Sequence, residues 1–363
     1  MKIIKVSLGK RSYPIALEEN LLLKSGSILR KLDIGRDAII ITNSYLRKKF
    51  GKKLSRSLSD KDLSNKFYIV PDSEKAKSIR HCLDLVDKIA AYDKKKEIFL
   101  IALGGGVIGD LTGFIAAIYK RGVPFVQIPT TLLAQIDSAI GGKTAIDLKV
   151  AKNLVGAFYQ PRAVIIDTGL LASLPKRQIK SGLAEVIKYA VIKDRTLFSF
   201  LERNHTRVTS LNKKTIEHIE EKCIKIKAWV VARDEKEKKG IRTILNFGHT
   251  VGHAIESAGG YDKYNHGEAI SIGMVCAADI ANRLGLLRKK ELERIIGIIK
   301  LYQLPTKIRG VHTGKILNSL ARDKKFVRAK NRFVLPVSIG KVIVKKNIPE
   351  NLIREAISRN TAR

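Results

Sequence analysis

Residues 98–119 restrict the fold of this chain more than any other stretch, because they are almost wholly apolar and long enough to cross a bilayer. Asp110 stands in the middle of the stretch, which also holds Gly104, Gly105, Gly106, Gly109 and Gly113. Adjacent glycines make a poor helix interior, and lipid cannot satisfy a loosened backbone. We therefore expect a buried strand, a glycine-rich loop and a helix, and no contact with a membrane.

Short β-rich segments alternate with helical periodicity over the first half of the chain. Strands are predicted at 37–42, 66–70, 97–103, 125–128 and 163–166, a helix at 78–91, and a pair of strands within 2–17. Strands that alternate with helices pack as a largely parallel sheet. The sequence therefore predicts an N-terminal parallel-sheet α/β domain.

The periodicity changes close to Leu174 and Pro175. Helices are predicted at 182–192, 214–233, 249–258, 267–284 and 291–302, followed by a hairpin at 332–344 and a last helix at 351–358. We expect two domains: residues 1–175, with the parallel sheet, and residues 176–363, which are mostly α-helical.

The net charge of +35 raises the question of nucleic-acid binding. Basic runs recur at 47–53, 94–96, 236–239, 288–290 and 324–332, several interleaved with acidic residues and none alternating with aromatic residues. A solvated basic surface is favoured over a nucleic-acid interface. The positive field is expected to concentrate anionic substrates near the protein.

The cysteines and the N-terminus favour the cytoplasm. Cys82, Cys223 and Cys276 are far apart and never in a C-x-x-C spacing, which argues against a disulfide framework or a thiolate zinc site. Lys5 interrupts the only apolar run at the N-terminus, so no secretory signal is expected.

Glycines 104, 106 and 109 satisfy the pattern G-x-G-x-x-G between a predicted strand and a predicted helix. Such a turn presents backbone N–H groups and a helix N-terminus to a pyrophosphate. The strand is not the first of the fold, and no acidic residue follows about 20 positions later for the ribose. Phosphate binding is favoured, with a packing turn as the alternative.

A second polar region follows at Thr130, Thr131 and Asp137, and residues 141–147 resemble a shortened phosphate loop. A Walker loop would need glycine at position 137, so ATP hydrolysis is disfavoured. Anion binding by Lys143 and the local N–H groups remains as the expectation. Arg121, Lys152 and Asn153 add polar and cationic groups nearby in the sequence.

Three of the seven histidines fall within eighteen residues, at His249, His253 and His266. His249 and His253 are four residues apart on a predicted helix, a spacing that lets two imidazoles meet one metal ion. An acidic third ligand would complete an open, catalytic type of site. Three carboxylates are candidates, namely Glu185, Glu256 and Glu268.

Together these segments resemble the 3-dehydroquinate synthase family. The strings that carry the resemblance are GGGVIGD, KRGVP, IPTTLLAQIDS, GGKTA, KNLVG, GLAEVIK, NFGHTVGHAIE and HGEAISIGM. The match to the family runs in order from about residue 39 to residue 332, without a large gap. The resemblance implies an NAD- and metal-dependent lyase of the shikimate pathway, which converts 3-deoxy-D-arabino-heptulosonate 7-phosphate into 3-dehydroquinate and phosphate.

The resemblance also implies roles for individual residues. The Zn²⁺ or Co²⁺ ligands would be Glu185, His249 and His266, which replaces the pairing of His249 with His253. Catalytic groups would be Lys143, Lys188, Glu237, Arg242 and His253. Substrate contacts would come from Arg121, Asp137, Lys143, Asn153, Lys188, Lys227, Arg242, Asn246 and Lys324, with Arg121 acting in the partner's site of a homodimer.

The implied NAD contacts lie in the first domain. They are Asp72, Glu74, Lys75, Gly106, Val107, Ile108, Gly109, Asp110, Thr130, Thr131, Lys143, Lys152, Leu170, Leu171, Ala172 and Ser173. The chain departs from the family pattern at Ser73, usually glycine, and at Asn43, usually an acidic residue on the ribose side. We expect these departures to alter NAD affinity.

Three other functions remain as alternatives at this point. The first is a sister sugar-phosphate cyclase, although Arg242 and Lys227 favour a substrate with a carboxylate. The second is a polyol or glycerol-phosphate dehydrogenase of related architecture, which would accumulate NADH. The third is a basic nucleic-acid-binding protein that retains the scaffold, which the intact metal and cation positions disfavour.

Overall fold

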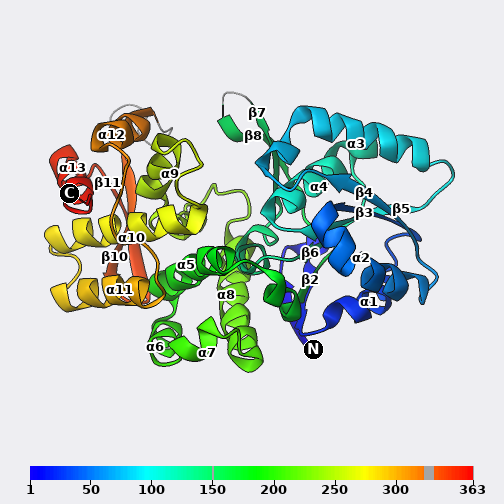
Figure 1. The fold of residues 1–363 in the computed structure, drawn as a ribbon, viewed down its shortest axis with the longest axis horizontal. Coiled ribbons are helices and arrows are strands. Elements are labelled where there is room, and N and C mark those ends of the chain that lie inside the picture. Colours follow the sequence, from blue (N-terminus) through cyan, green and yellow to red (C-terminus); the bar gives the residue numbers. More distant parts are fainter. Residues whose placement is uncertain (149–150, 323–330, 363) are drawn as a thin grey trace. The chain divides into compact units, whose positions relative to one another are not determined.

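The structure is a computed structural model that describes residues 1–148, 151–322 and 331–362. Two compact units make up the described chain. The first contains Met1–Leu174 together with Ile216–Ala232, and the second contains Pro175–Thr215 together with Arg233–Arg363. Figure 1 shows the helices and strands of each unit in chain order.

A seven-stranded sheet organises the described part of the first unit. Its order is β1 (Lys2–Val6), β2 (Tyr13–Glu18), β9 (Ala163–Asp167), β6 (Phe125–Pro129), β5 (Ile98–Gly104), β3 (Asp37–Asn43) and β4 (Ser64–Val70). Only β1 pairs antiparallel, and every other pairing is parallel. The predicted parallel α/β fold of this part of the chain is confirmed.

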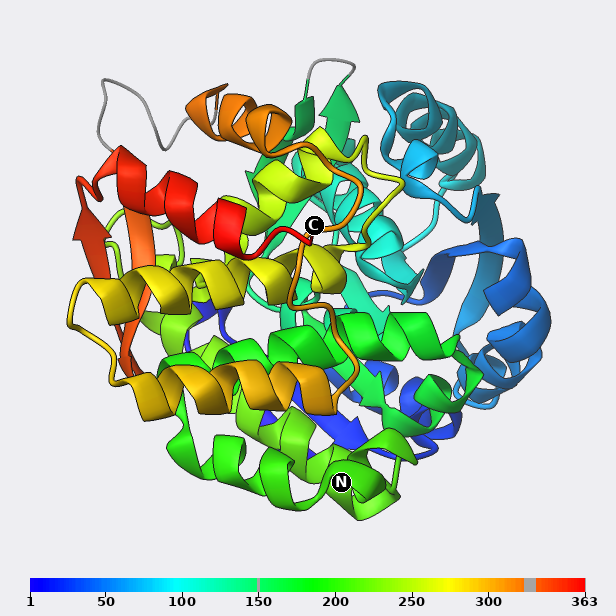
Figure 2. The ribbon, with the colours of Figure 1, turned by 60° about the vertical axis from the view of Figure 1, so that its left-hand side comes forward.

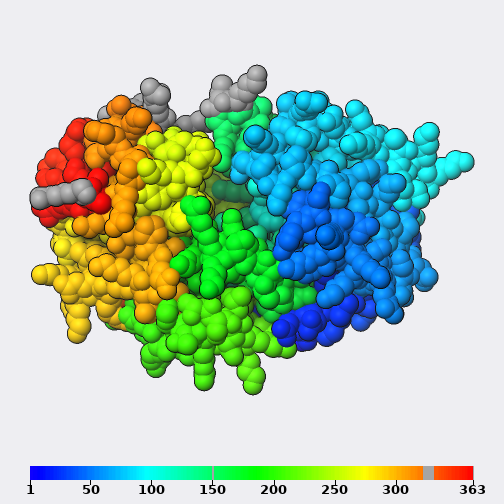
Figure 3. Space-filling model, in the orientation of Figure 1, coloured from blue at the N-terminus to red at the C-terminus, as the bar shows by residue number. Residues whose placement is uncertain are grey.

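Helices of the first unit follow the strands. They are α1 (Ser25–Leu32), α2 (Ser44–Ser59), α3 (Ile79–Tyr92) and α4 (Gly106–Ile118). The side chain of Asn43 caps α2 by accepting from the backbone N–H of Leu46 at 2.7 Å, and Ser78 caps α3 in the same way. Apolar side chains of these helices and of the central strands form one large core. The outer surfaces of α1 to α3 appear in blue to cyan in Figure 3.

A smaller apolar cluster covers β2 and β9 from another direction. It joins Ile15 and Val164 of these strands to Ile224, Ala228 and Val231 of α8 (Lys213–Arg233). Residues 216–232 therefore pack as part of the first unit although they follow it by about 40 positions in the chain. The burial of α8 against the sheet also places its polar residues in the same unit.

Residues 141–147 do not form a phosphate loop. Lys143 begins strand β7 (Lys143–Leu148), which pairs antiparallel with β8 (Ala151–Phe158). No helix follows Lys143, so the helix N-terminus that a phosphate loop needs is missing there. The expectation of a shortened phosphate loop was wrong because the Gly141–Gly142 pair, both at positive φ, is the turn that enters a hairpin.

The second unit is mostly helical, as predicted. Its helices are α5 (Lys176–Lys193), α6 (Arg195–Arg203), α7 (His205–Thr209), α9 (His249–Ala258), α10 (His266–Arg283), α11 (Lys289–Leu301), α12 (Thr313–Arg322) and α13 (Glu350–Arg359). A hairpin of β10 (Arg332–Ser338) and β11 (Lys341–Lys346) completes it. Figure 2 shows α10 in yellow, with α5 and α11 alongside it. The nearly complete burial of α10 makes it the centre of this unit.

No helix among the described residues is both long enough and apolar enough to cross a membrane. The 98–119 stretch is instead the buried strand β5, the glycine turn and α4, as its glycines predicted. All three cysteines are buried and free.

Glu220 of α8 is an acidic residue in the apolar interior of the first unit. Its side chain is fully buried, and neither carboxylate oxygen has a hydrogen-bond partner among the described residues. Burial, reinforced by Glu217 and Asp167, raises the pKa of Glu220 well above the ordinary 4.5. Because the unfolded chain loses this proton first, the free energy of unfolding falls as the pH rises above about 4.5.

We predict that Glu220→Gln increases the free energy of unfolding by roughly 1–3 kcal/mol at about pH 8, because it removes the ionisable group. The gain should shrink as the pH approaches 4.5. Urea unfolding at several pH values measures both effects.

Glu221→Gln is the matched control. Hydrogen bonds from Lys2 and Lys225 lower the pKa of Glu221 to about 2, so this change should cost up to about 1 kcal/mol at neutral pH. A wild-type and an E220Q protein with the same stability at every pH would contradict the account of Glu220.

Candidate metal and nucleotide sites

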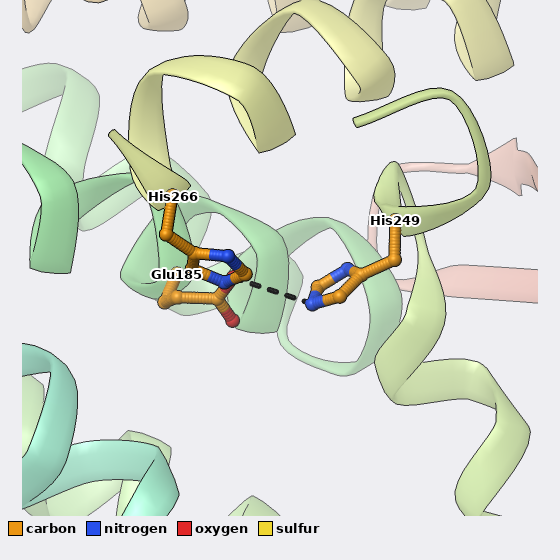
Figure 4. Close-up of side chains that lie close together, drawn as sticks. All are labelled: Glu185, His249 and His266. Atoms are coloured by element: carbon orange, nitrogen blue, oxygen red, sulfur yellow. Dashed lines mark ion pairs between the residues drawn. The ribbon is translucent and has the colours of Figure 1, made fainter. Parts of the chain in front are cut away.

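Glu185, His249 and His266 lie together in the second unit (Figure 4). Glu185 belongs to the middle of α5, His249 is the first residue of α9, and His266 is the first residue of α10. Oε1 of Glu185 lies 3.7 Å from Nε2 of His249 and 3.4 Å from Nε2 of His266. Three ligand atoms of these residues lie within 4.8 Å of one another, so they converge on a single point.

Neighbouring groups orient both imidazoles. Nδ1–H of His249 donates to the carbonyl oxygen of Phe247 at 3.1 Å, which leaves the Nε2 lone pair free for an ion. His266 Nδ1 lies 3.5 Å from Oε1 of Glu256, the position of a supporting carboxylate behind a metal-bound histidine. Glu256 thus lies behind His266. The ligand atoms of His266 group with those of Glu185 and His249, and those of His253 group with Glu256 and His266.

The electrostatics of the cluster fit a divalent cation. Glu185 is fully buried, and its two oxygens accept no hydrogen bond among the described residues, although Lys188 forms an ion pair with it. Burial, and then the charge of Lys188, lower the pKa of His249 well below 6.5, which keeps this ring in the neutral form that binds metals. Without an ion, burial lowers the pKa of His266, but the adjacent carboxylates of Glu185 and Glu256 raise it to about 10. Two imidazole nitrogens and one carboxylate are the donor set of an open zinc site.

The other predicted residues of the second unit differ in their surroundings. Lys188 is buried beside Glu185, and the exposed His253 ring has its centroid 5.2 Å from that of His249. Asn246 and Gly248 precede α9, while Lys324 lies outside the described residues. The structure therefore brings Lys188 and His253 to the metal ligands.

Arg242 is held firmly although it lies on a short segment. Its backbone N–H donates to Asp234 at 3.0 Å, and its buried guanidinium donates to the carbonyl oxygen of Glu235 at 2.8 Å. Glu237, at positive φ, places Oε1 3.4 Å from Nε of Arg242. This turn fixes the direction of the guanidinium before any ligand arrives.

Most residues predicted to bind NAD follow the carboxyl ends of parallel strands in the first unit, whereas Lys143 and Lys152 lie in the antiparallel β7–β8 hairpin. Asp72, Glu74 and Lys75 follow β4, residues 106–110 follow β5, Thr130 and Thr131 follow β6, and residues 170–173 follow β9. Strand order reverses between β3 and β5, which is where open α/β sheets bind ligands. Asn43 at the end of β3 donates from Nδ2 to Oδ1 of Asp72 at 2.6 Å.

The N-terminus of α4 is suited to a pyrophosphate. Gly105 caps it without any side-chain hydrogen bond, so the first N–H groups of α4 are not satisfied by a capping side chain. A Cβ on Gly104 or Gly109 would approach Ile108 at 2.4 Å or Gln127 at 2.8 Å. Two of the three motif glycines, Gly104 and Gly109, are therefore also needed for close packing. The motif fits both a phosphate-binding turn and a packing turn.

Lys77 is a functional candidate that the sequence reasoning missed. It is almost fully buried, and its Nζ lies 2.8 Å from Oδ2 of Asp110 and donates to Oδ1 of Asn153. Burial raises the pKa of Asp110 to about 6 although Lys77 lowers it. Glu74 lies 3.8 Å from Lys77 and 3.7 Å from Lys152, so one network joins the segment after β4 to α4 and β8. The one clue in the sequence was its position three residues after Glu74. That clue does not distinguish Lys77 from the many exposed lysines of this chain.

Three remaining cations of the first unit lie in different places. Lys227 of α8 is buried and forms an ion pair with Asp137. Lys143 is exposed at the start of β7. Arg121 follows the last turn of α4, about 20 Å along this helix from the glycine turn. It therefore lies apart from the predicted NAD residues 106–110 at the start of the helix.

Comparison with known families gives matches over most of the chain. Residues 67–181 match the model described as "3-dehydroquinate synthase N-terminal", and residues 182–326 match "3-dehydroquinate synthase C-terminal". Proteins named 3-dehydroquinate synthase from Desulforamulus reducens and Thermodesulfovibrio yellowstonii are 44% and 42% identical. Each alignment covers 99% of this chain and 100% of the relative.

Solved structures extend the likeness to related cyclases. A 2-deoxy-scyllo-inosose synthase complexed with carbaglucose-6-phosphate, NAD⁺ and Co²⁺ has a TM-score of 0.90 and 27% identity over 99% of this chain and 100% of its own. A 2-epi-5-epi-valiolone synthase from Streptomyces hygroscopicus, with NAD⁺ and Zn²⁺ bound, has a TM-score of 0.85 and 26% identity, covering 97% and 98%. A probable glycerol dehydrogenase from Sinorhizobium meliloti, at 15% identity and a TM-score of 0.67, shares the fold.

We predict that His266→Ala abolishes stable binding of Zn²⁺ or Co²⁺, because it removes one of three ligands. Glu256→Gln should weaken the affinity by about 10–100-fold through the orientation of His266. Elemental analysis after competition with a chelator measures both.

His253→Ala is the control for the metal site, since its ring lies outside the triad of Glu185, His249 and His266. This variant should retain the metal. Loss of metal from the His253 variant, with retention in the His266 variant, would show that the spacing-based pairing of His249 with His253 is the correct one.

We predict that Lys77→Met lowers the free energy of unfolding by roughly 2–4 kcal/mol, because Asp110 and Asn153 lose a buried partner. Lys75→Met, at an exposed position two residues earlier, should change it by less than about 0.5 kcal/mol. Adding Asp110→Asn to Lys77→Met should restore part of the loss. Equal urea midpoints for the two single variants would contradict the network.

Proposed function

The chain belongs to the 3-dehydroquinate synthase family, and we propose that it converts 3-deoxy-D-arabino-heptulosonate 7-phosphate into 3-dehydroquinate and phosphate. The observation that supports this most directly is the convergence of Glu185, His249 and His266 on one point. The reaction belongs to the shikimate pathway, which leads to the aromatic amino acids. The cofactors are NAD and a divalent metal ion, Zn²⁺ or Co²⁺.

Each cofactor has its own set of residues. Glu185, His249 and His266 hold the metal, and the loops after β3 to β6 and β9 hold NAD, with the N-terminus of α4 on the pyrophosphate. When bound, the metal supplies Lewis acidity at the substrate hydroxyl groups and NAD supplies a hydride acceptor that is regenerated within each turnover. We place the functional division of the chain at about residue 175, with NAD before it and metal and substrate after it.

The substrate carries a phosphate and a carboxylate, and the chain supplies fixed cations for both. Arg242 enters the reaction already oriented by Asp234 and Glu235, so little side-chain entropy is lost when it binds an oxyanion. Lys188 is buried beside Glu185 and forms an ion pair with that carboxylate, which holds the ammonium group in place. Lys143, Asn153, Asp137, Lys227, Asn246 and Lys324 complete the proposed substrate contacts.

Proton transfer is assigned to groups of the second unit. The His253 ring lies close to both imidazoles of the metal set and is exposed, so it can exchange a proton with a substrate oxygen. Elimination of phosphate needs a proton removed beside a carbonyl, and the leaving phosphate of the substrate itself can accept it. When the phosphate accepts this proton, His253 and Glu237 act as positioning and relay groups for it.

Two further proposals concern the protein in the cell. Arg121 is exposed at the far end of α4 from the glycine turn, which suits a residue that acts in the site of a partner subunit, and we propose a homodimer. The three buried, unbridged cysteines suit a reducing compartment, so we place the protein in the cytoplasm.

We predict that the purified protein, loaded with NAD and Zn²⁺ or Co²⁺, releases phosphate and 3-dehydroquinate in equal amounts from the heptulosonate phosphate. NADH should not accumulate, because the hydride returns within each turnover. Removal of the metal by a chelator should abolish the reaction, and added metal should restore it. Phosphate release and the absorbance of NADH measure these outcomes.

Glucose 6-phosphate serves as the comparison substrate, because it carries a phosphate and no carboxylate. Arg242→Gln should reduce kcat/KM for the heptulosonate phosphate by about 100-fold or more. Turnover of glucose 6-phosphate in preference would make the protein a sister cyclase. Steady accumulation of NADH would make it a dehydrogenase.

A further inference from the structure

A groove of about 670 Å³ lies on the second unit. None of Glu185, His249 and His266 lines it. Its walls come from the start of α5, the segment before α10, the end of α11 and the loop that follows α11. Five basic side chains line it, Arg177, Lys263, Lys300, Lys307 and Arg309, against a single acidic one, Glu268.

The acidic residue of the groove is already neutralised. Nε and Nη2 of Arg177 donate to the two oxygens of Glu268 at 2.8 and 2.7 Å, a bidentate pair. Glu268 also accepts from the backbone N–H of Asn265 at 2.9 Å, in the capping box of α10. The bidentate pair with Arg177 neutralises the charge of Glu268, so this carboxylate offers no free charge to the other cations.

Three of the cations have no partner. The side chains of Lys300, Lys307 and Arg309 form no hydrogen bond or ion pair with any residue in the described parts of the chain. All three are exposed. Three like charges around one concavity repel each other and create a local positive potential, which a bound anion would relieve.

The groove is built on a loop that is tied down at several points. Lys263 Nζ donates to the carbonyl oxygen of Gly310 at 2.6 Å, and Tyr264 exchanges hydrogen bonds with the backbone of Arg309. Ser271 of α10 donates to the carbonyl oxygen of Pro305 at 2.8 Å, and Lys180 donates to Gln303. Figure 2 shows this orange segment crossing near the start of α10. The cations are therefore presented by a rigid frame, which lowers the entropic cost of binding.

In a second basic groove on the same unit, more of the cations already form ion pairs. It has a volume of about 470 Å³ and includes Arg195, Arg288, Lys290 and Arg294. Arg195 forms an ion pair with Glu291, and Arg294 forms a bidentate one with Glu202. Half of its cations are thus already satisfied by carboxylates, which leaves the larger groove as the stronger anion site.

We propose that the larger groove binds a small polyanion, a metabolite with two or more phosphate or carboxylate groups, through Lys300, Lys307 and Arg309. A volume of about 670 Å³ accommodates a molecule of metabolite size. The anion groups bind the three unpartnered cations, while Arg177 remains on Glu268. Because the groove shares no residue with the groups proposed for the reaction, its test does not depend on turnover.

The test is a calorimetric titration of the holoenzyme at physiological ionic strength, with fructose bisphosphate in one arm and tricarballylate in the other. The two arms distinguish a phosphate ester from a polycarboxylate. In the triple variant Lys300→Gln, Lys307→Gln and Arg309→Gln, the Kd of the bound probe should rise at least about tenfold, because three charge-assisted contacts are lost.

A second triple variant controls for net charge. Lys341→Gln, Lys345→Gln and Lys346→Gln remove the same charge from exposed positions of β11 outside the groove, and this variant should bind like the wild type. Binding of one probe alone supports the proposal and identifies the ligand class. Absence of binding of both probes, or equal effects of the two triple variants, overturns it.

Discussion

The buried carboxylate of Glu185 is the constraint on which the second unit depends. A charge at full burial is costly unless cations or polar groups surround it. Lys188 comes from the same helix, but the two imidazoles come from the first residues of α9 and α10, so three helices must meet closely. Gly267 and Gly273 allow this approach, because a Cβ there would lie 2.4 Å from Ser181 and 1.9 Å from the carbonyl oxygen of Gly248.

The first unit follows a different physical rule. Parallel strands direct all their carboxyl ends to one edge of the sheet, so residues from distant parts of the chain meet there without any local signal. Lys77, which follows β4, and Asp110, in the helix α4 that follows β5, illustrate this. Asn153 joins them from the antiparallel strand β8. The same geometry places Asn43 against Asp72, so that a carboxylate from the loop after β4 stands beside the end of β3. Packing decides these pairs, and sequence spacing does not.

The basic side chains of this chain lie in three kinds of surroundings. Many lysines and arginines are exposed or form surface ion pairs that contribute little to stability. A smaller number are buried and oriented, such as Lys77, Lys188, Lys227 and Arg242. A third group, which lines the groove after α11, is exposed and has no hydrogen-bond or ion-pair partner in the part of the chain that the structure describes. Composition counts all three groups alike, and only their contacts separate a solvated charge from one prepared for a ligand.

The sequence by itself determined the parallel sheet, the helical second half and the strand–turn–helix at 98–119, because hydrophobic periodicity and glycine spacing act locally. It also limited the acidic metal ligand to Glu185, Glu256 and Glu268. Spacing alone paired His249 with His253, whereas the folded chain brings His266 to His249 and places Glu256 behind it. The tertiary structure also decided the hairpin after Gly142 and the burial of Lys77, because both depend on contacts between segments that are not neighbours in the chain.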